Sequence, residues 1–439
     1  MPIEEFTVGS DTIDDLLASL TIDVELQAES AHLGFLDVYL ARVPMLRLGG
    51  EGPLTLDIAA SDGWLSPDSR FQLDGPIVSL DYAGLRAVGN GSVIGSVLAE
   101  SHNTQVLATL EAFSVYRPMD SAVLAQGENL EARIVNDSTA INRPASGIAI
   151  TVELPPAHVP DLAAFDLYVP ASTGLTVTGG EATFAAQLSY DSVSQSGTGS
   201  LQLSGDVMQA TFSDIQLTAS TDLKAVFPIV EMDEGRVGIS GTELNISDVV
   251  IRRGDQVRDR GWWGHIYVAE GDIRWTPQIL ANTPESDEEP SVEADTVVDE
   301  SNLVEQLRES TSIDARISAD LRDTGPVTAL MQQRAPKLSW FDGALTVENV
   351  SVTSDVQLLG ADVGLHNLRL IGGRKGRLEI LGQLELHEKE EEGLLFARLG
   401  RLSAAVKLDP GERDWKLTRS KAWYDEQVRL FSRDSGGGE

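Results

Sequence analysis

The 439-residue chain contains no cysteine. This absence excludes disulfide bonds, cysteine-ligated zinc and thiol catalysis. It fits a reducing cytosol, and it fits equally well a protein of the cell envelope that does not use disulfide chemistry. Aromatic residues are also few, at 6% of the chain. An interior of Val, Ile, Leu and Ala is therefore expected, either as a smooth aliphatic lining or as a plain β core.

Basic residues are scarce. The chain has 33 Lys and Arg against 68 Asp and Glu, which gives a formal net charge of -35. Such a charge repels nucleic acid and anionic membrane surfaces, so we expect neither as a direct partner. The same charge does not oppose an apolar lipid that is shielded inside the protein.

Long hydrophobic runs are missing as well. No segment approaches the roughly 20 apolar residues that a membrane-spanning helix requires. The first residues, Met1 to Phe6, have neither the basic region nor the apolar run of a signal peptide. We therefore expect no signal or transmembrane segment in this chain, and membrane anchoring only if the native protein is longer.

Motifs for catalysis and metal binding are absent too. None of the six histidines lies four residues from another, so no helical histidine pair is available for a metal. The run Gly238-Ile239-Ser240-Gly241 falls short of a nucleophile elbow. Carboxylates are too abundant for a glycosidase pair to be nominated. The sequence predicts a protein that is not an enzyme and that has no cofactor and no metal.

What the chain does contain is alternation of apolar and polar residues. Between Gly174 and Arg252 the pattern repeats in short runs; Leu201 and Leu203, for example, flank Gln202. A period of two means that one face of each strand meets an apolar environment and the other meets water. Similar runs begin at Ile22 and extend from Leu338 to Leu408. Short helices are expected at 11–20, 302–309, 326–335 and 419–431, and a helical turn at 161–165.

These strands predict a mainly β fold. Because few long helices are expected to cover it, the apolar face of the sheet needs some other covering. A second sheet would supply one and give an ordinary sandwich core. Alternatively, the sheet curls around a lipid.

A six-residue pattern interrupts the alternation five times. It reads apolar, any, Asp or Asn, apolar, any, apolar, and it occurs at 35–40, 212–217, 246–251, 347–352 and 365–370. The alternation slips by one residue at each Asp or Asn, which would move the apolar set to the wrong face unless a bulge or tight turn absorbs the slip. Asp and Asn tolerate the backbone angles that this requires. We therefore predict a bulge or turn at each copy.

Three local features have alternative interpretations. Gly89, Gly91 and Gly95 are interpreted as turn or bulge glycines, because their spacing fits no phosphate-binding loop and no Lys follows. Trp262 and Trp263 are expected to pack in the protein, although tryptophans beside arginines also suit sugar stacking or a membrane interface. Pro155-Pro156 is predicted to end the strand that begins at Ile148.

Composition divides the chain into five segments. Residues 285–305 hold nine acidic side chains and no basic one, which is typical of a linker or mobile loop. The predicted segments are an N-terminal β segment at 1–155, a central β-ladder at 156–280, the acidic linker or mobile loop at 281–310, a C-terminal β segment with a terminal helix at 311–431, and a disordered tail at 432–439.

Two runs, 174–184 and 343–352, resemble the strand repeats of AsmA-like proteins of the AsmA, TamB and YdbH type, and residues 400–424 resemble the end of such a protein. These are bridge-like lipid-transfer proteins of the bacterial envelope. The resemblance implies a long curled antiparallel sheet, a trough or taco-like groove, whose apolar inner face holds phospholipid acyl chains. It also implies an inner-membrane anchor, so this chain would be a C-terminal portion.

The resulting hypothesis is a non-catalytic protein of the periplasm or cell envelope. It would bind or conduct phospholipid along an apolar β-groove between the inner and outer membranes, with envelope membrane proteins as further partners. The alternative is a structural or adhesive extracellular β-repeat protein in which the same residues form a closed core. The lipid-groove candidates are Leu201, Leu203, Phe212, Leu217, Val237, Ile239, Leu345 and Val347.

Overall fold

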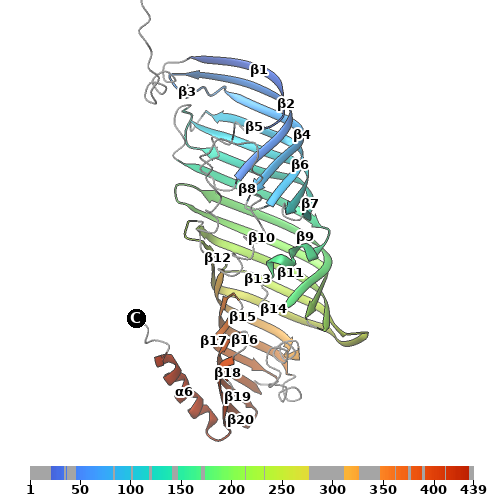
Figure 1. Ribbon diagram of the computed structural model, residues 1–439, viewed down its shortest axis with the longest axis vertical. Coiled ribbons are helices and arrows are strands. Elements are labelled where there is room, and N and C mark those ends of the chain that lie inside the picture. Colours follow the sequence, from blue (N-terminus) through green and yellow to red (C-terminus); the bar gives the residue numbers. More distant parts are fainter. Residues whose placement is uncertain are drawn as a thin grey trace, which may run out of the picture. The chain divides into compact units, whose positions relative to one another are not determined.

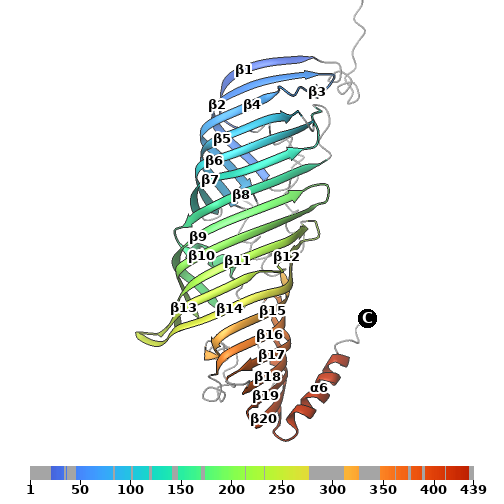
Figure 2. The same cartoon turned by 180° about the vertical axis from the view of Figure 1, so that it is seen from behind.

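The computed structural model describes residues 21–33, 36, 46–82, 85–99, 102–117, 121–140, 147–169, 174–212, 214–231, 233–275, 311–325, 347–360, 362–373, 377–387, 391–410 and 412–434. These residues form twenty-one strands and two helices, and the strands are joined in antiparallel ladders (Figures 1 and 2). The prediction of a mainly β fold with few short helices is confirmed. The predicted helices at 11–20, 302–309 and 326–335 and the acidic segment at 281–310 lie outside the described residues.

Contacts divide the chain into two compact units. Unit 1 comprises residues 1–164, 181–202 and 229–231. Its strands are β1 (Ile22–Ser30), β2 (Leu46–Ser61), β3 (Trp64–Leu65), β4 (Arg70–Tyr82), β5 (Leu85–Leu98), β6 (Asn103–Arg117), β7 (Ala122–Asn136) and β8 (Ile148–Val159), with parts of β9 (Leu175–Asp191) and β10 (Ser196–Phe212).

Unit 2 comprises residues 165–180, 203–228 and 232–439. It holds most of the 3-10 helix η2 (Leu162–Tyr168) and of β11 (Ile215–Glu231). The remaining strands are β12 (Arg236–Gly238), β13 (Glu243–Arg253), β14 (Gln256–Arg274), β15 (Ser312–Asp323), β16 (Glu348–Leu359), β17 (Asp362–Gly372), β18 (Leu378–Leu386), β19 (Glu391–Leu399), β20 (Leu402–Asp409) and β21 (Glu412–Lys416). Helix α6 (Ser420–Asp434) follows them.

Successive strands pair in register, so the alternation in the sequence becomes two faces. In β2, for example, Leu46 and Leu48 are buried whereas Arg47 between them is exposed. β2 pairs with β1 on one side and with β4 on the other. The same neighbour-to-neighbour pairing continues through β8, and in unit 2 from β13 to β21.

A bulge or turn is confirmed at three of the four described copies of the six-residue pattern; at Asn349 the backbone angle is unusual, but β15 and β16 pair without a register shift. Asp248, Asn349 and Asn367 have positive φ angles of 52°, 54° and 50°. The strand register shifts directly around Asp248 and Asn367. Asp214 lies in the tight turn between β10 and β11. The first copy, with Asp37, lies outside the described residues.

The glycine interpretation is confirmed for Gly89 and Gly91, which lie at register shifts, but not for Gly95, which lies in a regular part of the ladder. Gly89, Gly91 and Gly95 all lie within β5, and the register of β5 against β6 shifts between Asn90 and Gly91. A Cβ atom at Gly89 or Gly91 would lie 1.9 Å from a carbonyl oxygen of β6. Gly89 and Gly91 therefore permit close backbone approach at a bulge.

Two expectations need correction. β8 does not end at Pro155-Pro156 but continues to Val159, with a register shift against β9 between Leu154 and Ala157. The bulge accommodates two residues that cannot donate ladder hydrogen bonds. Only one of the two tryptophans packs as expected. Trp262 is buried and its Nε1 donates to the Asp323 carbonyl, whereas Trp263 is 40% exposed.

The terminal helix is confirmed, although it continues to Asp434. It packs through Tyr424, together with Trp423 and Val428, on Phe396 and Leu394 of β19. The opposite face of these strands forms a second cluster, which includes Leu384, Leu395 and Val406. Leu430 of this helix is 47% exposed, because the helix turns Tyr424 rather than Leu430 toward the sheet.

Candidate functional site

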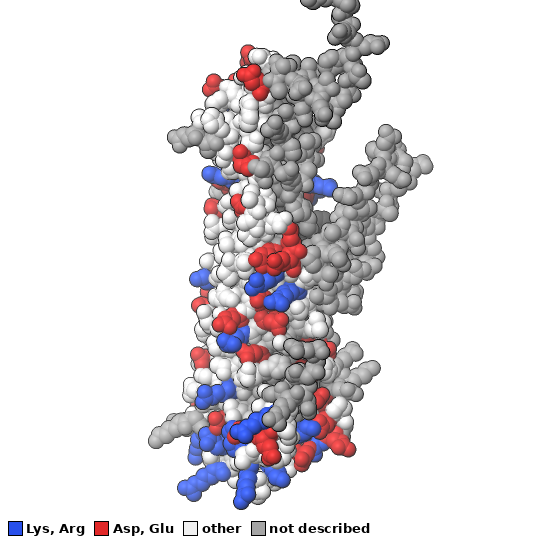
Figure 3. All heavy atoms as spheres, turned by 90° about the vertical axis from the view of Figure 1, so that its left-hand side faces the viewer, with Lys and Arg blue, Asp and Glu red and all other residues white. Residues whose placement is uncertain are grey.

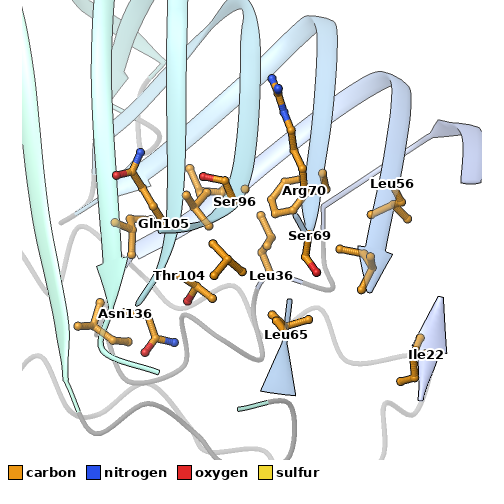
Figure 4. A pocket seen from close by; sticks show the side chains of 18 residues that line it. Ile22, Leu36, Leu56, Leu65, Ser69, Arg70, Ser96, Thr104, Gln105 and Asn136 are labelled. Carbon is orange, nitrogen blue, oxygen red and sulfur yellow. The ribbon is translucent and has the colours of Figure 1, made fainter. Parts of the chain in front are cut away.

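A cavity of about 310 Å³ lies within unit 1 (Figure 4). Its lining comes from every strand of β1 to β8 and from Leu36. The residues are Ile22, Leu36, Leu48, Leu56, Ile58, Leu65, Ser69, Arg70, Phe71, Gly95, Ser96, Val97, Thr104, Gln105, Val106, Ile134, Asn136 and Ile148. From β1 to β8 the ladder takes six steps, which would span about 29 Å in a flat sheet. The sheet of unit 1 must therefore curl to surround one small cavity.

A contact between residues far apart in the sequence closes this curl. The Leu65 amide of β3 donates to the Thr139 carbonyl at 2.9 Å. Trp64 forms an isolated antiparallel bridge with Ala140. These bonds join the β2–β3 hairpin to the segment that follows β7. We call this contact, made by Trp64, Leu65, Thr139 and Ala140, the strap.

Three of the polar lining residues belong to the other face of the sheet. Arg70 is opposite Ser96, and Ser96 is opposite Gln105, so the three side chains share one face. Figure 4 shows Arg70 and Gln105 extending away from Leu36 and Leu65. Arg70 donates from Nη2 to Gln72 Oε1 at 2.8 Å along that other face. These residues therefore contribute little polar character to the cavity interior.

The other polar lining groups are bonded within the protein. Ser69 is 2% exposed, and its Oγ both donates to the Ala59 carbonyl at 2.6 Å and accepts from the Ala59 amide at 3.1 Å. Thr104 Oγ1 donates to the Ser138 carbonyl, and Asn136 Oδ1 accepts from the Ser138 amide. Satisfied groups of this kind have little need of a ligand partner. The surface that remains for an occupant is mainly aliphatic.

An aromatic ring covers a glycine in the cavity wall. Phe71 is paired with Gly95 across β4 and β5. A Cβ atom at Gly95 would lie 1.9 Å from Phe71 Cε1, so the ring lies directly over the glycine backbone. The missing side chain at Gly95 thus lets the Phe71 ring lie flat against the wall instead of filling the cavity.

None of the seven predicted groove residues that the structure describes lines this cavity. Leu217 and Val347 each pack against a cluster in unit 2 that crosses seven strands. Its buried members are Ala219, Val249, Trp262, Leu321, Val350, Leu370 and Leu378. Each of these seven side chains is less than a tenth exposed, so the centre of this cluster is covered, whereas Leu217 and Val347 at its margin are half-buried.

The other predicted residues lie elsewhere on the sheet. Leu201 and Leu203 are half-buried in β10, and Phe212 is 9% exposed at its end. Val237 is half-buried in β12, and Ile239 contacts the Gly271 position. Leu345 lies outside the described residues.

Sequence reasoning missed the cavity residues for a physical reason. The sequence alternates at Leu56 and Ile58 in β2 and again at Phe71 and Leu73 in β4, so it does predict these strands. Alternation identifies the apolar face, but it carries no signal of whether a neighbour fills the space above that face. The contact that closes the curl joins Leu65 to Thr139, which lie 74 residues apart in the sequence. Local alternation therefore cannot predict it.

The described part of the chain holds no group of three or more His, Asp or Glu residues placed to bind a metal ion. Within the same residues, no helix has the length and hydrophobicity that crossing a bilayer requires. Comparison with protein-family models, with curated proteins and with solved structures finds no match to this chain.

Proposed function

We propose that the protein is a non-catalytic lipid-binding protein of the cell envelope that holds or conducts phospholipid acyl chains along the apolar face of its curled sheet. The observation that carries this proposal is the aliphatic cavity of about 310 Å³ in unit 1. Ligand pockets are commonly about 300–1,000 Å³, so the cavity is at the small end of the range and suits part of an acyl chain.

The chemistry of the lining favours an apolar occupant over water. An ordered water needs roughly two to four polar partners, and apolar cavities without them stay dry. Here the Ser69 and Thr104 hydroxyls already have partners in the protein. Each acyl methylene transferred from water gains about 0.8 kcal/mol. A hydrocarbon chain therefore needs no specific polar group in order to bind.

The resemblance of residues 174–184 and 343–352 to AsmA-like strand repeats supports the same proposal. It extends the proposal to phospholipid as the lipid, to the periplasm or envelope as the location, and to transfer between the inner and outer membranes as the task. The curl and the strap of unit 1 are what a sheet needs to shield an acyl chain from water.

A structural or adhesive β-repeat protein is the second candidate. The covered cluster in unit 2, in which Leu378 is 0% and Val350 is 1% exposed, favours it. Side chains buried in this way pack as those of a closed core do. The two candidates therefore differ in whether the apolar face of unit 1 takes an occupant.

Native mass spectrometry of the purified chain, followed by solvent extraction and lipid analysis, tests the proposal. We expect bound phospholipid at a reproducible stoichiometry. Leu56→Trp should reduce it severalfold, because the larger ring fills the cavity. Thr55→Trp is the matched control, since Thr55 is the exposed neighbour on the opposite face.

Folding of both variants is checked by circular dichroism and urea titration. A lipid-free, cooperatively folded wild-type chain that takes up no added phospholipid would contradict the proposal. Equal lipid content in folded Leu56→Trp and Thr55→Trp would contradict the assignment of the site to this cavity.

A further inference from the structure

Three leucines are exposed at one end of the C-terminal strands of unit 2. Leu399 and Leu402 face each other across the β19–β20 turn and are 37% and 76% exposed. Leu417, which follows β21, is 71% exposed. A 2.8 Å hydrogen bond between Ser403 Oγ and Ser420 Oγ fixes the segment after β21 beside that turn. Apolar side chains gathered on adjacent loop tips indicate an interaction site.

Four basic side chains surround these leucines. Arg401 lies in the turn itself, and Lys416 and Arg419 flank Leu417. Arg377 is adjacent, because the Gly400 amide donates to its carbonyl at 2.7 Å. All four are exposed, and none makes an ion pair with another described residue. We call Arg377, Leu399, Arg401, Leu402, Lys416, Leu417 and Arg419 the basic tip.

Charge separates along these strands. Their other end carries Glu391, Glu392, Asp409 and Glu412. Residues 398–433 hold nine basic and five acidic side chains, a balance of +4, whereas the rest of the chain carries -39. Figure 3 shows several Lys and Arg side chains, with Asp and Glu among them, in the region where Figure 1 places β18 to β20. Within unit 2, the turn end of these strands that holds Arg377, Arg401 and Arg419 thus carries basic residues, although the chain as a whole is strongly acidic.

We propose that the basic tip docks on the surface of an anionic lipid bilayer. The leucines would enter the boundary between headgroups and acyl chains, while the guanidinium and ammonium groups bind lipid phosphates. Each basic residue near an anionic leaflet contributes about 1 kcal/mol, or about fivefold in affinity. Charge complementarity and the exposed leucines together favour this occupant.

The net charge of the whole chain does not prevent this docking. At physiological ionic strength the Debye length is about 8 Å, so charges farther from the contact are largely screened. The expectation that anionic membranes are repelled, drawn from the average charge, therefore does not apply to the tip.

Vesicle flotation of the full chain tests the inference. Vesicles of phosphatidylcholine with about 30% phosphatidylglycerol should carry the protein, and pure phosphatidylcholine vesicles should carry at least about fivefold less. Arg401→Glu and Arg419→Glu should each reduce binding about fivefold or more. Leu402→Ser with Leu417→Ser should reduce it too, and raised salt should weaken it in the wild type.

Matched controls distinguish binding through the basic tip from nonspecific effects of removing an exposed leucine or reversing a charge elsewhere. Leu359→Ser changes a 58% exposed leucine at the β16–β17 turn, opposite Asp362 rather than beside arginines. Arg252→Glu reverses an exposed arginine of β13. Both should bind like the wild type. Equal binding to neutral and anionic vesicles, or equal losses in controls and tip variants, would overturn the inference.

The inference is independent of lipid in the cavity. Leu56→Trp should leave flotation unchanged, and the tip variants should leave the lipid content measured by mass spectrometry unchanged. An empty cavity with intact flotation would refute only the proposed function. A filled cavity without flotation would refute only docking at the tip.

Discussion

Single residues set the register of this sheet. Asp248, Asn349 and Asn367 have left-handed φ angles in the middle or at the start of strands, where most side chains are strained. Asn367 also donates from Nδ2 to Asp355 Oδ2 at 2.6 Å, and Arg316 Nε donates to Asp355 Oδ1 at 3.0 Å. Asn367 first, and then Arg316, lower the pKa of Asp355. The bulge residue is thus bonded to a polar network across three strands.

Asp248 provides the simplest test of the bulge, because its φ is 52°. Asp248→Val should lower the free energy of unfolding by about 1–2 kcal/mol, since a β-branched residue is strained at that angle. Asp248→Gly should be nearly neutral. Urea titration measures both, and a neutral Asp248→Val would show that the bulge does not depend on this angle.

A second test at the residue scale concerns Gly95. Gly95→Val should force the Phe71 ring off the wall and into the cavity, at a cost of about 1–3 kcal/mol for overpacking. Bound lipid should fall with it. The double variant Gly95→Val with Phe71→Leu should recover much of the stability, because the clashing ring is gone. Additive losses in the double variant would argue against this contact.

At the scale of elements, the docking of α6 depends on Tyr424. Burial, and to a smaller extent the charge of Asp425, raise the pKa of Tyr424 to about 12 from the ordinary 10.0. Between pH 10 and 12 the unfolded chain loses the phenolic proton while the folded chain keeps it. The contribution of Tyr424 to the free energy of unfolding is therefore fully present below pH 10. Between pH 10 and 12 it falls by about 1.4 kcal/mol per pH unit.

Fluorescence of half-buried Trp423 reports this docking. In the wild type the urea midpoint should fall steeply above pH 10. Tyr424→Phe should remove that part of the pH dependence, since Phe has no proton to lose. An identical alkaline profile in the two proteins would show that Tyr424 does not couple α6 to pH.

At the scale of the whole molecule, the net charge of -35 opposes compaction. Raising NaCl from about 0.01 to 0.1 M shortens the Debye length from about 30 to 10 Å. The thermal midpoint should therefore rise over this range and then level off. Binding to anionic vesicles should fall over the same range. A midpoint that does not change with salt would show that self-repulsion is unimportant.

The sequence by itself determined the class of fold and much of its local detail. Alternation predicted the strands, Asp248 and Asn367 predicted bulges, and the spacing in 419–431 predicted α6. Each of these depends on interactions between near neighbours, such as backbone angles, side-chain direction and helix periodicity, which a short window of sequence contains.

Only the tertiary structure decided which part of the apolar face stays open. Leu56 and Leu217 follow the same alternation, yet one lines a cavity and the other packs against a covered cluster. The difference comes from long-range contacts, such as the strap between Leu65 and Thr139. The basic tip has the same origin, because strand pairing brings Arg377, Arg401 and Arg419 to one end and leaves acidic residues at the other. The amino-acid composition gives only the net charge of the chain, whereas strand pairing places basic and acidic residues at different ends of the strands.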